Sequence, residues 1–380
     1  GEEEIEILFD EDDNLVDPSL MDSDQQTEFN DNLAEFLDSS TLSEISSKVL
    51  TNFQNDLDSR EDWYETFKDG LELLGIQNDP RSEPFEGASG VYHPLLAEAV
   101  THFQAQAYKE LLPANGPVDT KVMGASSDPK AMQANRVKDF MNYQLLYKME
   151  EYDPEMDQML FFLPLAGSAF KKCYFDPAIG RIVSRFIKAE DLVVPYSATD
   201  LHTSPRITHR MSMTENDLLK LQLSGFYLDT DMNAPMYGGD NDSVQSKIDE
   251  IDGVTRTGDQ HDFTLLECHT ELDIEGFEHT DSEGEPTGLA LPYIVTVCKD
   301  TNDVLAIRRN YVETDPMRKK VEYFTHFKFL PGLGFYGFGL IHMIGGVTKS
   351  ATAILRQLID AGTLANLPAG FKARGLNIQR

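Results

Sequence analysis

The hydrophobic period of the chain changes near residue 168, and this change constrains the fold more than any other feature. Up to Ala166 the apolar residues recur at spacings of three and four, which is typical of amphipathic helices. From Phe170 onward they form short alternating runs bounded by turn residues, which is typical of strands. One more helical pattern covers about Val347–Ala361. The sequence therefore predicts a mixed α+β fold with more than one domain.

The helical pattern starts at Gln26, and Thr41 with Glu44 forms a capping box before the next helix. Later helices are predicted over about 93–112, 129–151, 154–166, 215–224 and 244–251. The helix at 129–151 has apolar residues at core spacing: Val137, Phe140, Met141, Leu145 and Met149. Strands are predicted over 170–175, 181–187, 263–268, 293–298, 304–309 and 321–329.

The charge balance excludes some classes of protein. The chain has 32 Lys and Arg against 65 Asp and Glu, a formal net charge of −33. This argues against proteins that grip nucleic acid by neutralising its phosphates, and against docking on anionic lipid. Residues 1–80 carry −21, whereas residues 319–380 carry +6. We therefore consider two readings: a solvated acidic arm, or an arm that meets the basic end of another copy.

Cysteine usage and hydropathy indicate the redox compartment of the protein and its relation to membranes. The chain has three cysteines, Cys173, Cys268 and Cys298. They are too few for a disulfide scaffold, which favours a reducing compartment. The longest apolar stretch, from Met159 to Phe170, is shorter than the ~18 residues of a membrane-spanning helix. We expect no membrane partner.

A glycine-rich turn matches the GxGxxG pattern of dinucleotide-binding folds, from Gly332 to Gly337. The context is unfavourable, because Asp360 falls within the following helix rather than after a second strand. No second βα unit follows. The other reading is close backbone packing at the turn's four glycines: Gly332, Gly334, Gly337 and Gly339.

Metal-binding and nucleophile motifs are weak. His261, His269 and His279 cluster near Cys268 without paired ligand spacing, and no HExxH occurs. His202 and His209 also lack a matching carboxylate motif. No GxSxG occurs, and Ser89 is one residue out of that pattern. We therefore predict no catalytic residue, no metal and no cofactor.

The last predicted helix has two contrasting stripes. Its apolar stripe consists of Val347, Ala351, Ile354, Leu355 and Leu358, and its opposite stripe of Lys349, Thr352, Arg356 and Asp360. A helix of this kind can pack beside copies of itself, with its polar stripe toward a lumen or groove. We expect Lys349, Thr352 and Arg356 to face a channel or a neighbouring subunit.

Residues 336–342, the helix that follows and residues 355–375 form a distinctive run, of which 356–375 is the most specific part. These segments resemble the portal proteins of tailed double-stranded DNA bacteriophages. Residues 141–145, 167–172, 193–195 and 210–212 are also similar. The resemblance covers about 85–380.

The resemblance implies a ring of twelve identical subunits at one capsid vertex of the virion, assembled in the host cytoplasm. Double-stranded DNA passes through such a ring without sequence specificity during packaging and ejection. The implied partners are other copies of the chain, terminase, head–tail adaptor and tail proteins, and the major capsid protein. The resemblance implies no catalysis.

The resemblance also implies a division of the chain into segments. These are an acidic arm (1–40), an α+β wing (41–212), stem-directed helices with a polar linker (213–262), a β-rich clip (263–330) and a stem helix that starts to return to the wing (331–380). Portal chains continue further, so we expect this chain to be incomplete at its C-terminal end. Two alternatives stay open: a nucleotide-dependent oxidoreductase using the Gly332–Gly337 turn, and an adaptor protein that forms no ring.

Overall fold

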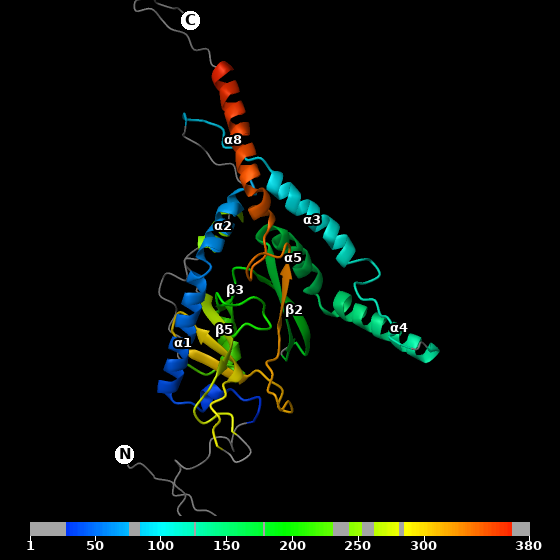
Figure 1. The fold of residues 1–380 in the computed structure, drawn as a ribbon, viewed down its shortest axis with the longest axis vertical. Helices are drawn as coiled ribbons and strands as arrows, with labels where there is room; N and C mark the ends of the chain where they lie inside the picture. Colours follow the sequence, from blue (N-terminus) through cyan, green and yellow to red (C-terminus); the bar gives the residue numbers. More distant parts are fainter. Residues whose placement is uncertain are drawn as a thin grey trace, which may run out of the picture. The chain divides into compact units, whose positions relative to one another are not determined.

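The computed structural model describes residues 28–75, 84–124, 127–177, 179–230, 243–252, 262–280 and 285–366. Within them, helices combine with two antiparallel sheets, which confirms the predicted α+β class (Figure 1). The chain forms two compact units. Unit 1 comprises 1–60, 190–240 and 257–323, and unit 2 comprises 61–189, 241–256 and 324–380.

Unit 1 is built on a five-stranded antiparallel sheet in the order β3-β4-β5-β6-β7. The strands are β3 (Leu192–Val193), β4 (Arg206–Thr214), β5 (Asp262–Leu272), β6 (Leu291–Cys298) and β7 (Val304–Arg309). In the register of the central strand, Cys268 lies between Thr208 and Val295.

Helices cover both faces of this sheet. Since alternate residues of a strand point to opposite sides, neighbouring residues of β5 pack against different helices. Helix α1 (Ser39–Asp58) covers one face, and its buried Phe53 packs with Leu266 of β5. Helix α6 (Glu215–Leu223) covers part of the other face, where its Leu218 packs in one cluster with Leu265. Burial on both faces explains why β6 reads as a nearly continuous apolar run.

The segment before α1 differs from the prediction. Residues 28–38 form no long helix but one short 3₁₀ turn, η3 (Leu33–Glu35). The Asn32 side chain caps the edge strand β7: its Nδ2 donates to the Leu305 oxygen at 3.0 Å, and its Oδ1 accepts from the Ile307 nitrogen at 2.9 Å. This end of the predicted acidic arm is therefore attached to unit 1 and blocks an open sheet edge. Residues 1–27 lie outside the described part of the chain.

The start of α1 also differs from the predicted capping box of Thr41 and Glu44. The N-cap is Asp38, whose carboxylate accepts from the backbone nitrogens of Ser40 (3.0 Å) and Thr41 (3.4 Å). The side-chain hydroxyl of Ser40 stabilises the ionised form most, and the pKa of Asp38 falls to about 2. Asp satisfies the exposed N–H groups of a helix start as well as Thr does, so the N-cap lies three residues before the predicted one.

Unit 2 contains a three-stranded antiparallel sheet in the order β2-β1-β8. Its strands are β1 (Ser168–Asp176), β2 (Arg181–Lys188) and β8 (Phe324–Lys328). Helix α5 (Tyr152–Ala166) is apolar nearly all round and packs its Met159 and Leu160 against Ala169 of β1. This burial fits the even distribution of its apolar residues.

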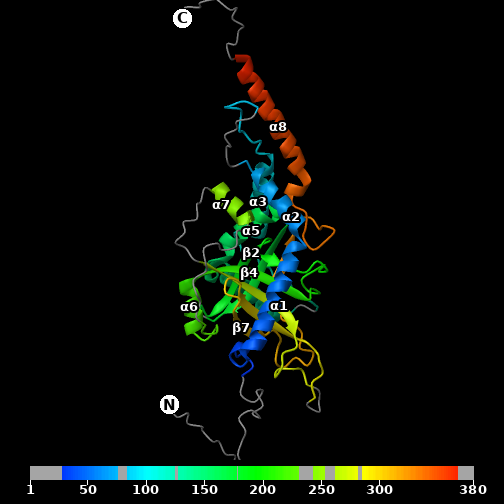
Figure 2. The same cartoon turned by 90° about the vertical axis from the view of Figure 1, so that its left-hand side faces the viewer.

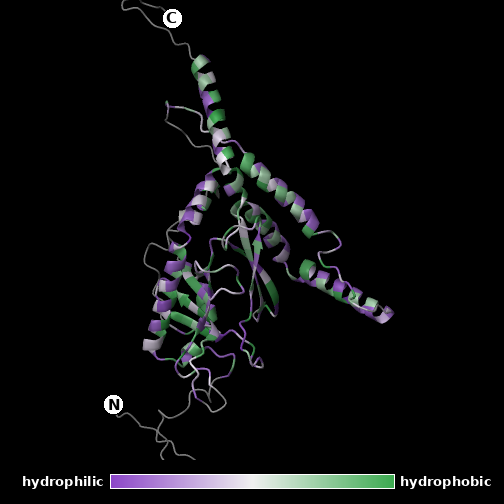
Figure 3. Ribbon diagram, viewed as in Figure 1, coloured by the Kyte–Doolittle hydropathy of each residue, from purple (hydrophilic) through white to green (hydrophobic). Residues whose placement is uncertain are grey.

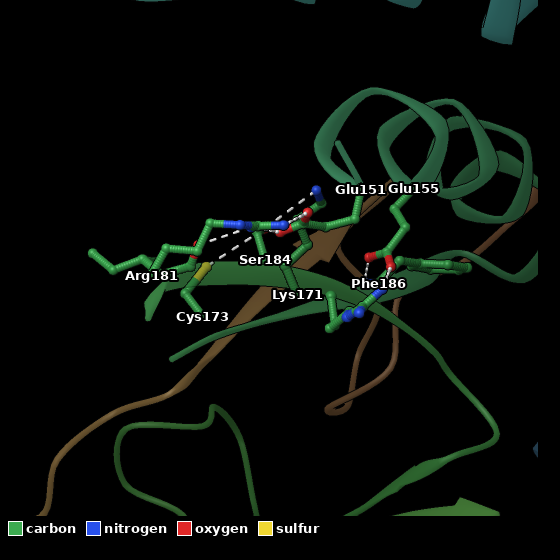
Figure 4. Close-up of polar contacts among 9 residues, drawn as sticks. Glu151, Glu155, Lys171, Cys173, Arg181, Ser184 and Phe186 are labelled. Atoms are coloured by element: carbon green, nitrogen blue, oxygen red, sulfur yellow. Dashed lines mark hydrogen bonds and ion pairs between the residues drawn. The ribbon is translucent and has the colours of Figure 1, made fainter. Parts of the chain in front are cut away.

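Two ion pairs fix the start of α5 to the edge strand β2 (Figure 4). Arg181 grips both carboxylate oxygens of Glu151, at 2.7 and 2.8 Å, and Arg185 Nη1 lies 2.8 Å from Glu155 Oε1. Glu155 also accepts a hydrogen bond from the Phe186 backbone nitrogen. The bidentate contact from Arg181 lowers the pKa of Glu151 to about 2.

The other helices of unit 2 are α2 (Glu61–Glu72), α3 (Leu95–Leu111), α4 (Asp128–Tyr143), α7 (Ser243–Asp252) and α8 (Leu340–Asn366), and a π-helical turn, η4 (Gln144–Lys148), follows α4. Helix α3 packs on α5 and α8. Helix α7 lies beside α2 (Figure 2), where Lys247 pairs with Glu72 at 3.0 Å.

Helix α8 is longer than the predicted 347–361. It begins at Leu340 and continues to Asn366, through three glycines that are expected to weaken or end a helix: Gly345, Gly346 and Gly362. Gly345 is buried, and a Cβ added there would make an ordinary contact at 3.5 Å with Leu73, which follows α2. The close approach of α2 and α8 instead uses Gly70 of α2, where an added Cβ would overlap the Ile341 side chain. The packing of α8 on α2 outweighs the low helix propensity of its glycines.

Strand partners cross the predicted segment borders. Strands β3 and β4, from the segment predicted as the wing, pair in one sheet with β5–β7, from the segment predicted as the clip. Strand β8, also in the predicted clip segment, pairs instead with β1 in unit 2. Periodicity identifies a strand and its buried face, whereas the choice of partner depends on contacts distant in sequence.

Candidate functional site

Helix α8 is attached to unit 2 by its polar stripe. Thr352 is 4% exposed, and its hydroxyl accepts a hydrogen bond from the His93 backbone nitrogen at 3.0 Å. Two turns later, Asp360 accepts from the Ser89 backbone nitrogen at 2.7 Å. The side chains of α8 thus satisfy backbone donors of the 89–93 segment, which forms neither helix nor strand.

Arg356 strengthens the same attachment. Its Nε donates to the Val91 oxygen at 2.7 Å and its Nη2 to the Gly90 oxygen at 3.3 Å. The guanidinium also lies over the Tyr92 ring, 4.3 Å from its centroid. Because the planar guanidinium makes all these contacts together, Arg356 fixes the rotation of α8 about its own axis.

The expectation that Lys349, Thr352 and Arg356 face a channel or a neighbouring subunit stays a prediction. Within the chain, Thr352 and Arg356 bind the 89–93 segment, whereas Lys349 is exposed. The periodicity correctly separated the two stripes of α8. It carries no information on which of them packs against the rest of the same chain.

The apolar stripe of α8 is the exposed one. Val347 is 60% exposed, Ile354 66% and Leu358 69%. These residues belong to a run with alternating spacings of four and three, which we call the α8 stripe: Val347, Ala351, Ile354, Leu358, Ala361 and Ala365. Figure 3 shows the hydrophobic residues along this helix.

The spacing of the α8 stripe is that of a coiled-coil interface, where a and d positions meet a facing helix. Three of its residues are alanines, which permit a close approach between helix axes. An apolar stripe of this length on the surface of a single chain indicates a protein partner.

A cavity of about 650 Å³ lies beside α8, and we call it the α2–α8 cavity. Lys349, Thr352 and Arg356 line it, so all three predicted site residues meet at one place. Three carboxylates also line it: Asp69, Glu72 and Asp360. The apolar part of the wall is formed by Leu73, Phe85, Ala353, Ala361 and Leu364.

The glycine-rich turn before α8 packs closely against the backbone that leads into β1. A Cβ on Gly337 would overlap the carbonyl oxygen of Gly167, and one on Gly339 would overlap that of Leu165. Gly167 itself has a φ of +87° and is tightly enclosed by the backbone of the turn. Two backbone segments therefore cross with no room for side chains.

The two earlier glycines of the turn differ from each other. A Cβ on Gly332 would meet the Tyr336 oxygen at 2.7 Å, whereas nothing lies within 4 Å of one on Gly334. Of the four glycines predicted to allow close packing, three are in close contact with backbone and Gly334 is not.

The turn has little capacity to hold a phosphate. The Gly337 N–H donates to Ser168 Oγ at 2.8 Å, and the Gly339 N–H donates to His342 Nδ1 at 3.1 Å. These two N–H groups of the turn are therefore already bonded within the chain and are not available to a phosphate. Both sheets are antiparallel, whereas the dinucleotide fold requires a parallel sheet.

The histidines have other partners. His269 Nε2 lies 2.8 Å from Glu267 Oε1, and His202 pairs with Glu322. Across the described ranges, no three His, Cys, Asp or Glu residues are grouped so as to hold a metal ion. His261 lies outside those ranges.

The three cysteines are free, with Cys173 exposed and Cys268 and Cys298 buried. Burial raises the pKa of the Cys268 thiol to about 11. This thiol therefore stays protonated and unreactive at neutral pH.

Helix α4 carries a second apolar surface that was not predicted from the sequence. The helical spacing predicts Val137, Phe140 and Met141 as core residues, but all three are exposed on α4. The signal that could have found them is the position of Arg136 and Tyr143 on the same helical face as Phe140.

Neither the protein-family models nor the curated proteins include a match to this chain. Among the helices of the described ranges, none has the length and apolar character needed to cross a membrane.

Proposed function

We propose that the chain is the subunit of a ring-shaped portal, a conduit for double-stranded DNA at one vertex of a phage capsid. One observation carries the proposal: the α8 stripe is exposed although α8 is firmly attached to its own unit. The likeness of residues 336–342 and 355–368 to portal proteins supports the same function.

The attachment of α8 explains why the stripe needs another chain. Thr352, Arg356 and Asp360 hold the helix by its polar side, so it cannot rotate to bury Ile354 and Leu358 in its own subunit. Burying each of these side chains would stabilise an assembly by about 1.5–3 kcal/mol. Identical subunits that meet through two different surfaces form a closed ring when the rotation between them closes.

The charge of the chain suits a conduit rather than a clamp. A ring that neutralised many phosphates would bind the duplex tightly and slow its movement. With a net charge of −33 per subunit, the assembly repels DNA at long range and lets it slide.

Within this proposal, α8 is a stem helix and the clip is drawn from β5–β7. Because β3 and β4 share the sheet of β5–β7, and β8 joins β1, the wing comprises the remaining elements of 61–189 rather than the whole 41–212 segment. The ring stands at the capsid vertex of the virion beside the major capsid protein, after assembly in the host cytoplasm. The proposed partners of the clip are terminase during packaging, and adaptor and tail proteins afterwards.

Electron microscopy of the purified chain tests the proposal. We expect rings with an open centre and a fixed number of subunits. Single small particles at all concentrations would instead support the adaptor alternative.

A further inference from the structure

Helix α4 and the turn η4 carry an exposed stripe that combines aromatic and basic residues, which we call the α4 stripe: Met132, Arg136, Phe140, Tyr143 and Tyr147. Phe140 is 61% exposed and Tyr147 is 74% exposed. The rings of Tyr143 and Tyr147 stack at 5.9 Å, and Lys148 Nζ lies 5.6 Å from the Tyr143 centroid.

The opposite face of α4 makes the contacts with its own chain. The Asn142 amide exchanges two hydrogen bonds with the Val118 backbone, at 2.9 and 3.0 Å. Lys138 pairs with Asp119 at 2.8 Å. The α4 stripe therefore points away from the segment that anchors the helix.

An isolated helix of this length is only marginally stable in water, and its packing supplies most of its stability. Solvent-exposed Phe and Tyr side chains at consecutive turns are also typical of an interface. Both considerations indicate that a protein surface covers the α4 stripe.

The α2–α8 cavity has the complementary chemistry. Asp69, Glu72 and Asp360 give it three carboxylates, and Phe85 and Leu364 contribute to its apolar wall. Helix α2 itself has five acidic residues and one lysine, whereas 128–148 has four basic residues and two acidic ones. Two bases, Lys349 and Arg356, line the same cavity, and Lys247 pairs with Glu72 at 3.0 Å. The charge complementarity to the α4 stripe therefore rests on Asp69, which is exposed at the cavity wall.

We propose that the α4 stripe of one copy inserts into the α2–α8 cavity of the next copy. The proposal rests on the ring function above, since it names another copy of the chain as the occupant. Figure 1 shows α3 and α4 extending on the opposite side of α8 from α2, so the two surfaces are separate on unit 2. Two separate and complementary surfaces make a head-to-tail contact, which is the type that closes a ring.

A charge swap tests this pairing. Arg136→Glu in the α4 stripe and Asp69→Lys in the cavity should each lower the ring fraction about tenfold, because each places like charges together. A mixture of the two variants should form rings again, since every contact in an alternating ring then joins opposite charges. The double variant in one chain should also recover.

Matched controls make the same charge changes outside the interface. Lys130→Glu lies on α4 away from the α4 stripe, and Glu65→Lys lies on α2 away from the cavity lining. Both should assemble normally. Thermal unfolding of all four single variants should match that of the wild type, since the changed residues are exposed.

Coupling of lysines to carboxylates gives an independent readout. In rings mixed from light and heavy isotope-labelled chains, we expect zero-length coupling of Lys148 to Asp69 or Glu72 between different copies. Coupling confined to single copies would overturn the proposal.

The outcomes separate this inference from the proposed function. If Arg136→Glu and Asp69→Lys form rings as well as the wild type does, the inference fails and the ring stands. If Arg136→Glu forms rings but loses retention of a DNA duplex, the α4 stripe is a nucleic-acid surface and the inference fails. If the wild type is monomeric, both fail.

Discussion

At the scale of single residues, the crossing of the glycine-rich turn over β1 gives the sharpest prediction. Gly337→Ala should destabilise unit 2 by about 1–3 kcal/mol, because the new Cβ overlaps the Gly167 carbonyl and backbone must shift. Denaturant unfolding measures the loss.

Gly334→Ala is the matched control in the same turn. Nothing lies within 4 Å of its Cβ, so its stability should equal or slightly exceed that of the wild type. Equal losses in the two variants would show that the turn is sensitive to any side chain and not to the crossing.

The Glu151–Arg181 pair predicts a dependence on pH. The folded pKa of Glu151, about 2, is below its ordinary value of 4.5, so the pair stabilises the fold fully above pH 4.5 and loses its effect as the pH falls toward 2. Glu151→Gln should cost about 1.5–3 kcal/mol at pH 7. Urea unfolding between pH 7 and pH 2.5 follows the difference between variant and wild type.

Glu150→Gln removes the same charge from the neighbouring, exposed position and is the control. It should cost little at any pH. A difference between Glu151→Gln and the wild type that stays constant down to pH 2.5 would contradict the low pKa.

Some of these residue contacts could be predicted from the sequence. The spacing of the glycines indicated either a phosphate loop or close packing, and it identified Gly337 and Gly339. It could not show that Gly167 faces them, because that contact joins residues about 170 positions apart. Likewise, the sequence could separate the polar and apolar stripes of α8. It could not show that the polar stripe, through Arg356, packs against the chain's own 89–93 segment.

At the scale of elements, the α8 stripe should control assembly without affecting the fold of the chain. Leu358→Asp places a charge at a position that is 69% exposed in the single chain and buried in the proposed ring. We expect the ring fraction to fall by more than about tenfold with an unchanged unfolding temperature, because burying an unpaired carboxylate costs several kcal/mol. Size-exclusion chromatography with light scattering measures the ring fraction.

Thr363→Asp is the control, since Thr363 is also exposed but lies on the opposite side of α8. It should leave assembly unchanged. Equal loss of rings in both variants would show that added negative charge, rather than the α8 stripe, is responsible.

Most elements were predictable, because a helix or strand is encoded by local periodicity, but strands β3 and β4 were not predicted. The differences arise where distant contacts decide. Helix α8 continues through Gly345 where it packs on α2, and the apolar residues of α4 face outward since Asn142 and Lys138 anchor its other side. Local pattern gave no means of seeing either contact.

At the scale of the whole molecule, charge should prevent tight binding to DNA. At 0.15 M salt we expect no saturable binding of a short duplex below about 10 μM protein, because the acidic surface repels the phosphates. Fluorescence anisotropy against salt concentration measures it. Nanomolar binding with a steep salt dependence would indicate a clamp and contradict the conduit.

The division of the chain into two units was the least predictable feature. Unit 1 gathers β4 and β5, which pair over nine consecutive positions although about 50 residues separate them along the chain. Strand β8 leaves its sequence neighbours and joins β1. Hydrophobic pattern specifies that a strand needs a partner, and the three-dimensional packing alone specifies which one.

Native mass spectrometry of the wild-type chain over a range of concentrations tests the central claim most directly. A portal subunit of 42.7 kDa should appear as one closed multiple of that mass, twelve copies if the resemblance holds, with no larger species. A mass of 42.7 kDa at every concentration, or an open ladder of oligomers, would contradict the ring.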